Sequence, residues 1–384
     1  MVSEYYNDFL DSSEKSIKEK SAPLQFKLST EDADQFLDSE STVSRFCNML
    51  DKTLENLDDE INRFENNFFD SQNSIFWAST YQDVFDSLKR IFKTHKIKSV
   101  RLPNINASTL FRELGIKFFL RDEHVELAED ADANFFIADL MLSDTGSLLL
   151  LNQSNNSLGK LTNSKTNIFF TTIDRIIGNS SWIEVYRHLC SYSKGMDAQD
   201  MVMFRSSPNC NSYLFIIDNQ RTSLLQHRFL RKALTCLHCG RCNEVCPVYQ
   251  TIGETPYNNV FTGPIANVIL PHLETYETCM HLAYACTLCG NCEEVCPISL
   301  PIRDMIIENR KMFLSSKVLD RRHRRMMFVL RKMLESRSKL NKSPLLKRHL
   351  FMNYLSYDIR KSRILPSFQK ETFNKLYKNK LQQQ

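Results

Sequence analysis

Short apolar runs and helical apolar repeats alternate through the first half of the chain. From Tyr81 to Lys93 the apolar residues recur at the spacing of one helix face, whereas Ile97–Leu102 and Ile116–Leu120 have the length of buried strands. A helix over Ala107–Leu114 would join those two strands as a parallel pair. This alternation predicts an α/β region.

Phe135–Leu151 contains two apolar runs joined by Asp144-Thr145-Gly146. Asp and Gly favour tight turns, so we expect a strand pair that turns at Gly146. Further strands are expected at Asn167–Thr172, Val202–Arg205 and Tyr213–Asp218, and helices at Arg45–Phe64, Trp182–Ser193 and Thr222–Leu234. The last of these helices runs directly to Cys236, which predicts a rigid joint between the α/β region and the chain that follows.

The pattern after Cys236 is mainly helical. Gly263-Pro264 opens a helix that Pro271 should end or kink, and a second helix is expected over Glu277–Ala285. Leu300–Leu314 is amphipathic. Its expected inward residues are Ile302, Ile306 and Met312.

These patterns divide the chain into four parts. We expect a partly ordered leader at 1–40, an α/β domain at 41–230, a cysteine-rich helical domain at 231–316 and a basic helical segment at 317–384. Basic residues crowd Arg321–Arg348, where a solvated helix face is the commoner explanation and a docking surface the alternative.

Composition excludes several classes of protein. A chain of 384 residues with 42% hydrophobic content can bury a core, and its net charge of +4 is too small to imply a nucleic-acid partner. The nine glycines form neither a dinucleotide fingerprint nor a phosphate-binding loop. No stretch approaches the length of a membrane span, and no secretory signal is apparent, so we expect a cytoplasmic protein with reduced thiols.

Two cysteine runs of the same spacing carry the chemistry. The first is Cys236-Leu-His-Cys239-Gly-Arg-Cys242-Asn-Glu-Val-Cys246-Pro, and the second is Cys286-Thr-Leu-Cys289-Gly-Asn-Cys292-Glu-Glu-Val-Cys296-Pro. In two-cluster ferredoxins the fourth cysteine of such a run binds the other cluster. The spacing therefore predicts two [4Fe-4S] clusters, the first held by Cys236, Cys239, Cys242 and Cys296 and the second by Cys286, Cys289, Cys292 and Cys246.

Zinc and disulfides are the alternatives for so many cysteines. Structural zinc usually takes separated pairs of ligands, whereas each run here already holds four cysteines. Disulfides do not persist in a reducing compartment. Cys47, Cys190, Cys210 and Cys279 lie outside the runs and are expected to be small buried hydrophobes.

The sequence around the cysteines resembles the iron–sulfur subunits of bacterial lactate-utilization complexes. The resemblance rests on Cys236–Pro247, on Gly263-Pro264-Ile265 and on Leu288–Pro301, and it is weaker at Phe136-Ile-Ala and Asp144-Thr-Gly-Ser. It extends to Ile217-Asp-Asn-Gln-Arg221 and to Arg363-Ile-Leu-Pro366-Ser-Phe368, so that it spans most of the chain from about Arg45.

The resemblance implies a fold and a function. It implies an α/β N-terminal domain of the three-layer kind shared by glucosamine-phosphate deaminase, ribose-phosphate isomerase and CoA transferases, followed by a mainly α two-cluster ferredoxin domain. It also implies oxidation of L-lactate to pyruvate by a multi-subunit system, in which this chain relays electrons. The implied partners are cysteine-rich and lactate-utilization-domain subunits and an electron acceptor.

The N-terminal domain departs from that family. Its Lys/Ser-rich segment and the insertion that follows have no counterpart after Ser99–Leu102, so we expect a reduced or lost substrate pocket and a non-catalytic or co-catalytic subunit. Asp144, Thr145 and Ser147 are candidates for a small-acid pocket, and a simple turn is the alternative.

Two other functions stay open at this stage. The chain could be the iron–sulfur adaptor of another 2-hydroxy-acid or glycolate-type oxidoreductase. Alternatively, it could be a redox-sensing protein that binds through its basic segment, although no recognisable nucleic-acid-binding motif supports that function.

Overall fold

The computed structural model describes residues 40–69, 73–102, 116–120, 131–151, 165–194, 201–205, 210–257, 261–316, 321–336 and 373–382, together with a few single positions elsewhere. Apart from such positions, the expected leader, the expected helix at 107–114, the basic residues after 336 and the segment 363–368 lie outside the described residues.

The chain forms two compact units, Met1–Met312 and Phe313–Gln384. The first unit contains both the α/β region and the cysteine runs, and the second contains helices α15 (Arg321–Leu334) and α18 (Phe373–Leu381). Within the part of the chain that the structure describes, no helix combines the length and hydrophobicity needed to cross a membrane. The finer division at residues 230 and 316 stays a prediction.

A six-stranded parallel sheet organises the α/β region. Its strand order is β1 (Asn73–Ala78), β10 (Asn211–Ile217), β7 (Thr166–Thr172), β4 (Ala133–Ile137), β2 (Ser99–Leu102) and β3 (Lys117–Leu120). Each neighbouring pair in this order is parallel, including the pair β2 and β3 that the apolar runs predict. Because parallel strands end at the same edge, the loops after β7 and β10 emerge side by side.

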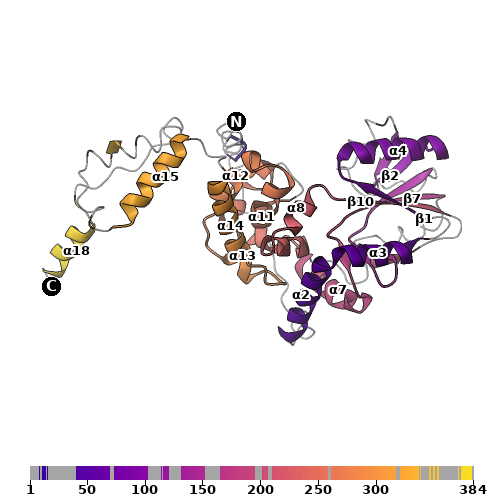
Figure 1. Ribbon diagram of the computed structural model, residues 1–384, viewed down its shortest axis with the longest axis horizontal. Coiled ribbons are helices and arrows are strands. Elements are labelled where there is room, and N and C mark those ends of the chain that lie inside the picture. The colour runs from indigo at the N-terminus through magenta and orange to yellow at the C-terminus, as the bar shows by residue number, and fades with distance from the viewer. Residues whose placement is uncertain are drawn as a thin grey trace. The chain divides into compact units, whose positions relative to one another are not determined.

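Helices cover both faces of this sheet. Figure 1 shows α4 (Tyr81–His95) on one side and α3 (Leu57–Phe68) on the other. Side chains alternate accordingly: Phe135 packs in the core beside α4, whereas the next residue, Phe136, packs in the core beside α3. The sheet is buried on both sides, which is why its strands are almost continuously apolar.

A smaller sheet packs into the α3 side of the core. Its order is β8 (Ile176–Ile177), β5 (Leu140–Leu142), β6 (Ser147–Leu151) and β9 (Met201–Phe204). The antiparallel pair β5 and β6 turns at Gly146, as expected. The first apolar run, however, is shared between two sheets, because β4 belongs to the large sheet and β5 to the small one.

The prediction of a single helix at Arg45–Phe64 is wrong in one respect, because two helices occupy this region. α2 (Glu40–Glu55) ends before Asn56, and α3 begins after it. Asn56 has a non-helical backbone with φ −116° and ψ 37°, and its side-chain amide donates to the Lys52 carbonyl at 2.9 Å. A side-chain amide that satisfies a terminal carbonyl stabilises the end of a helix.

The helix expected at Thr222–Leu234 is also divided. α8 (Arg221–Leu225) is followed by the 3-10 segment η3 (Leu230–Thr235), and between them the His227 ring accepts the Leu230 N–H at 3.2 Å. By contrast, the expected helix at Trp182–Ser193 is present as α7 (Ile183–Lys194), preceded by the 3-10 turn η2 (Ser180–Trp182).

The cysteine region is helical, as expected. Its elements are α9 (Arg241–Glu244), α10 (Pro247–Ile252), η4 (Thr255–Tyr257), α11 (Gly263–Leu273), α12 (Tyr276–Ala285), α13 (Asn291–Glu294) and α14 (Ile302–Ser315). On α14, Ile302 and Ile306 are buried as expected, whereas Met312 is only half-buried.

Pro271 neither ends nor divides α11, which continues to Leu273. Proline has no N–H to offer the carbonyl four residues earlier, here that of Asn267. The buried Asn309 side chain supplies the missing donor, because its amide donates to the Asn267 carbonyl at 3.1 Å and to the Val268 carbonyl at 2.9 Å. A side chain of α14 therefore replaces the hydrogen-bond donor that proline removes from α11.

The turn at Gly146 allows a stability prediction. Gly146 has φ +65°, and an added Cβ would lie 2.3 Å from the backbone carbon of Asn67. We expect Gly146→Ala to reduce the free energy of unfolding by about 3 kcal/mol or more, since α3 would have to move. Gly240→Ala is the control, because Gly240 has φ +79° and open space around it, and should cost only about 1 kcal/mol. Urea denaturation of the two variants would contradict this prediction if their losses were equal.

Candidate iron–sulfur site

The two cysteine runs fold into matching loops. In each, the residue before the second cysteine is left-handed, with φ 51° at His238 and φ 58° at Leu288. A left-handed glycine then precedes a one-turn helix, with φ 79° at Gly240 before α9 and φ 90° at Gly290 before α13. Left-handed non-glycine residues are uncommon and cluster at functional sites. Sequence repetition has thus produced repeated geometry.

Backbone N–H groups point at the sulfur atoms in both loops. The N–H of His238 donates to Cys236 Sγ at 3.4 Å, and that of Leu288 donates to Cys286 Sγ at 3.3 Å. The fourth cysteine of each run also accepts a backbone hydrogen bond. The N–H of Tyr249 donates to Cys246 Sγ at 3.5 Å, and that of Leu300 donates to Cys296 Sγ at 3.4 Å. Such donors favour the thiolate over the thiol, which is the form that binds metal.

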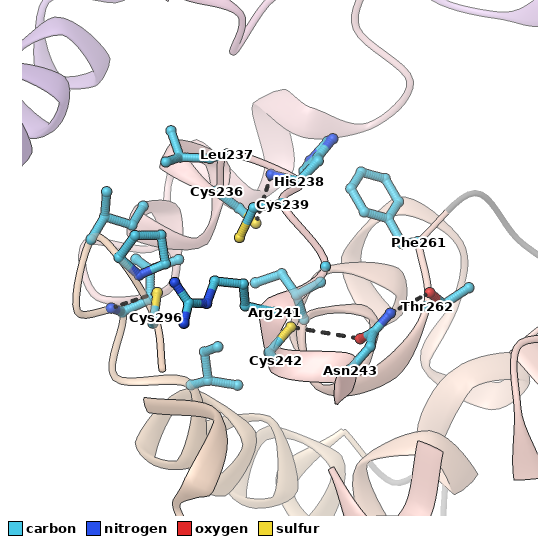
Figure 2. Close-up of a pocket in the computed structure, with 16 residues that line it drawn as sticks. Cys236, Leu237, His238, Cys239, Arg241, Cys242, Asn243, Phe261, Thr262 and Cys296 are labelled. Carbon is cyan, nitrogen blue, oxygen red and sulfur yellow. Dashed lines mark hydrogen bonds between the residues drawn. The ribbon is translucent and has the colours of Figure 1, made fainter. Parts of the chain in front are cut away.

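The first predicted set of four cysteines surrounds one cavity. This cavity has a volume of about 250 Å³, and Cys236, Cys239, Cys242 and Cys296 all line it. Figure 2 shows the sulfur atoms of Cys236 and Cys239 together on one side of the space and those of Cys242 and Cys296 on two other sides, with the Arg241 side chain extending between Cys242 and Cys296. The structure therefore brings the fourth cysteine of the second run to the first three of the first run.

The electrostatics of the first set agree with this grouping. Burial, with smaller contributions from Cys239 and Cys296, raises the pKa of the Cys236 thiol to about 12. Burial also raises the pKa of Cys242, with contributions from the same three thiols. Buried thiols that lie close together resist ionisation. They therefore keep their protons in the unbound protein, and a positively charged group that binds them must displace these protons.

The electrostatics of the second set follow the same crossed pattern. Burial raises the pKa of Cys292 to about 12, and further contributions come from Cys286, Cys246 and Cys289. The pKa of Cys246 is raised mainly by burial and also by Cys286 and Cys289 of the second run. Cys289 is exposed, so this set lies nearer to solvent than the first.

The donor chemistry fits a cluster better than a single ion. Among the residues that the structure describes, no three His, Cys, Asp or Glu side chains are close enough together to hold one metal ion. A four-iron cluster binds its cysteines at separate corners, so its ligands need not converge on one point. Four cysteines around a cavity of this size suit such a group.

Two arginines, which the sequence analysis did not single out, reach the cysteine loops. Arg175 donates from Nη1 to the Cys236 carbonyl at 2.9 Å, and its Nη2 contacts the His238 ring. Arg310 donates from Nη2 to the Cys286 carbonyl at 2.7 Å. No local sequence signal marks either residue, because each lies in a different element from the loop that it contacts.

The cysteines outside the runs divide into two kinds. Cys190, Cys210 and Cys279 are buried, as expected, whereas Cys47 is only partly buried. The Cys47 thiol donates to the Ile298 carbonyl at 3.5 Å, so α2 lies against the segment that follows Cys296.

The small-acid pocket candidates lie in the β5–β6 turn. The Asp144 carboxylate accepts the N–H and the hydroxyl of Ser180, both at 2.7 Å, and Ser147 is buried at the start of β6. Among the residues that the structure describes, one buried carboxylate oxygen of Asp144 and the Thr145 hydroxyl have no hydrogen-bond partner. The two hydrogen bonds from Ser180 to Asp144 support the simple-turn interpretation, and a role in binding an acid stays a prediction.

Comparisons with known proteins agree with the site. Residues 232–300 match the family model described as the 4Fe-4S dicluster domain. Lactate utilization protein B of Shouchella clausii is 26% identical over 53% of this chain and 44% of its own length. The proteins of the same name from Macrococcus caseolyticus and Bacillus subtilis are 29% identical, over 51% and 47% of this chain and 43% and 40% of their own lengths.

These matches are partial. The chain spans less than half of the length of these curated relatives. The similarity covers about half of this chain, whereas the sequence motifs predict a resemblance over most of the chain from about Arg45. A crystal structure of a DUF162 family protein from Deinococcus radiodurans is similar at a TM-score of 0.33 and 15% identity, over 42% of this chain and 98% of that one.

The comparisons confirm the expected resemblance: the chain is similar over about half of its length to proteins named Lactate utilization protein B, and its cysteine region matches the 4Fe-4S dicluster family.

Proposed function

We propose that this protein is an electron-transfer subunit that holds two [4Fe-4S] clusters and serves the oxidation of L-lactate to pyruvate. The observation that carries the proposal is that Cys296 of the second run lines one cavity with Cys236, Cys239 and Cys242 of the first run. The matched dicluster family supports the type of cluster. Cys236, Cys239, Cys242 and Cys296 would hold cluster 1, and Cys286, Cys289, Cys292 and Cys246 would hold cluster 2.

When bound, such clusters accept and release single electrons. The residues of this chain would hold them and control their surroundings. Ile265, Ile298, Leu300 and Ile302 line the cavity of cluster 1 and limit the access of water, and the backbone N–H groups at the sulfurs stabilise added negative charge.

The link to lactate comes from the names of the relatives, and the reaction comes from the family resemblance. We infer that a partner performs the chemistry at the carbon atom, because Asp144 and Ser147 are engaged in a turn and its contacts. Other lactate-utilization subunits and an electron acceptor would be the partners. We also infer a cytoplasmic location, where thiols stay reduced, and a relation of the α/β region to the deaminase, isomerase and CoA-transferase fold.

The crossed grouping predicts the iron content of cysteine variants. The wild-type chain, reconstituted without oxygen, should bind about eight iron and eight sulfide. Cys236→Ser with Cys296→Ser should remove about four iron, because both residues serve cluster 1, whereas Cys236→Ser with Cys246→Ser should remove about eight.

Iron and sulfide analysis of the purified variants checks this prediction. Cys190→Ser is the control, since this cysteine is buried outside the runs and should keep full iron content. The reverse pattern, with about eight iron lost in the first double variant and four in the second, would show that each run binds its own cluster. Zinc in place of iron would overturn the proposed function.

The lactate proposal makes a separate prediction about growth. A strain without this protein should fail to grow on L-lactate while growing normally on glycolate, because the electrons of L-lactate would have no route to their acceptor. Growth is measured on L-lactate, D-lactate and glycolate, with the wild-type gene restored as the control. Normal growth on L-lactate combined with failure on glycolate would instead identify an adaptor of a glycolate-type oxidation.

A further inference from the structure

A buried ionic group joins the α/β region to the first cysteine loop. Asp174 and Arg175 follow β7, and Arg221 follows β10, the neighbouring strand. The Asp174 carboxylate lies 2.8 Å from Arg221 Nε and 3.8 Å from Arg175 Nε, and it accepts the Thr172 hydroxyl at 2.5 Å. Only 2% of the Asp174 side chain and 12% of the Arg175 side chain are exposed.

Arg175 extends from this group to the loop of cluster 1. It donates to the Cys236 carbonyl at 2.9 Å and contacts the ring of His238, which packs edge-on against Phe261 at 4.9 Å between ring centroids. Cys236, His238 and Phe261 all line the cavity of cluster 1. A fixed positive charge of the α/β region is thus held beside that cavity.

Arg310 occupies the equivalent position in the second loop. It comes from α14, yet its guanidinium donates to the carbonyl of Cys286, the first cysteine of its run, at 2.7 Å. It is further anchored by two hydrogen bonds to the Ala283 carbonyl, at 3.0 and 2.8 Å. Two unrelated elements therefore bring an arginine to the same carbonyl of each run. This repetition indicates that the arginine serves the cysteine loop and not the element that carries it.

We propose that Arg175 raises the reduction potential of cluster 1 and that Arg310 raises that of cluster 2. A nearby cation stabilises the extra negative charge of a reduced cluster, and a buried one acts more strongly than an exposed one. Because Asp174 lies between Arg175 and Arg221, the charge balance of the α/β region acts directly on cluster 1. Both arginines are positioning residues, and this inference rests on the proposed two-cluster function.

Single substitutions that change charge test the inference. Arg175→Gln should move the midpoint potential of cluster 1 to a more negative value and leave that of cluster 2 unchanged. Arg310→Gln, the matched variant in the other loop, should do the opposite. Asp174→Asn removes a negative charge beside Arg175 and should move cluster 1 to a more positive potential, while Arg175→Lys, which keeps the charge, should stay closer to wild type than Arg175→Gln.

The readout is an anaerobic redox titration of the full-length protein followed by electron paramagnetic resonance. The Cys236→Ser and Cys246→Ser variants assign each signal to a cluster, and iron analysis measures occupancy. Opposite shifts in Arg175→Gln and Asp174→Asn support the inference, since loss of packing alone would not give opposite signs.

Two results would overturn the inference. One is an unchanged cluster 1 potential in both Arg175→Gln and Asp174→Asn. The other concerns the case in which Arg175→Gln does not assemble cluster 1. In that case, an unchanged cluster 1 potential in Asp174→Asn would overturn the inference by itself. A wild-type protein that binds iron but shows no reducible cluster would instead contradict the proposed function.

Discussion

The position of Cys296, the fourth cysteine of the second run, beside the first run is the constraint on which the rest of the cysteine region depends. Cys296 lines a cavity with the first run, and Cys286 and Cys289 of the second run contribute to the raised pKa of Cys246. Neither set of four can form until the chain between the runs has returned to its starting point. α11 and α12 provide that return, and their shared core includes Ala266, Leu270 and Leu282. The repair of the proline defect in α11 by Asn309 holds α14 to the same core.

The partial or full burial of seven of the eight thiols in the runs, Cys289 being exposed, has a second consequence, which concerns charge. Desolvation raises the pKa of Cys236 and Cys292 to about 12, so the folded region opposes the thiolate form. Backbone N–H donors and the two loop arginines act in the other direction. The same groups that favour thiolates also favour electron-rich sulfur, so the requirements of binding a cluster and of reducing it coincide.

The α/β region meets the first cysteine loop at the carboxyl edge of its parallel sheet. Arg175 follows β7 and Arg221 follows β10, and these strands are neighbours. Loops at this edge carry the functional residues of many open α/β sheets, because helix and strand ends converge there. Here the edge presents an arginine to the loop of Cys236. Further ion pairs, such as Lys232 with Asp51 at 3.3 Å, hold η3 against α2 close to the same loop.

Local patterns determined much of this protein. The apolar alternation predicts the parallel strands and the β5–β6 turn, because it reflects geometry between residues that are close in the chain. The cysteine spacing predicts the crossed grouping, because a run of this spacing gives its fourth cysteine to the other cluster in two-cluster ferredoxins. Helix continuity was less accessible. The break at Asn56 and the continuation through Pro271 depend on whether a side chain satisfies a backbone group, and for Pro271 that side chain is on another helix.

The arginines at the loops were decided by tertiary structure alone. Arg175 is 61 positions from Cys236, and the residues around it resemble any strand end. Its contact exists because β7 lies beside β10 and both end at the edge that faces the loop. The amino-acid sequence by itself therefore determined the type and the spacing of the cysteines in the two runs. Only the packing of distant elements decided which charges surround them, because electrostatic influence depends on distance in space and not on separation along the chain.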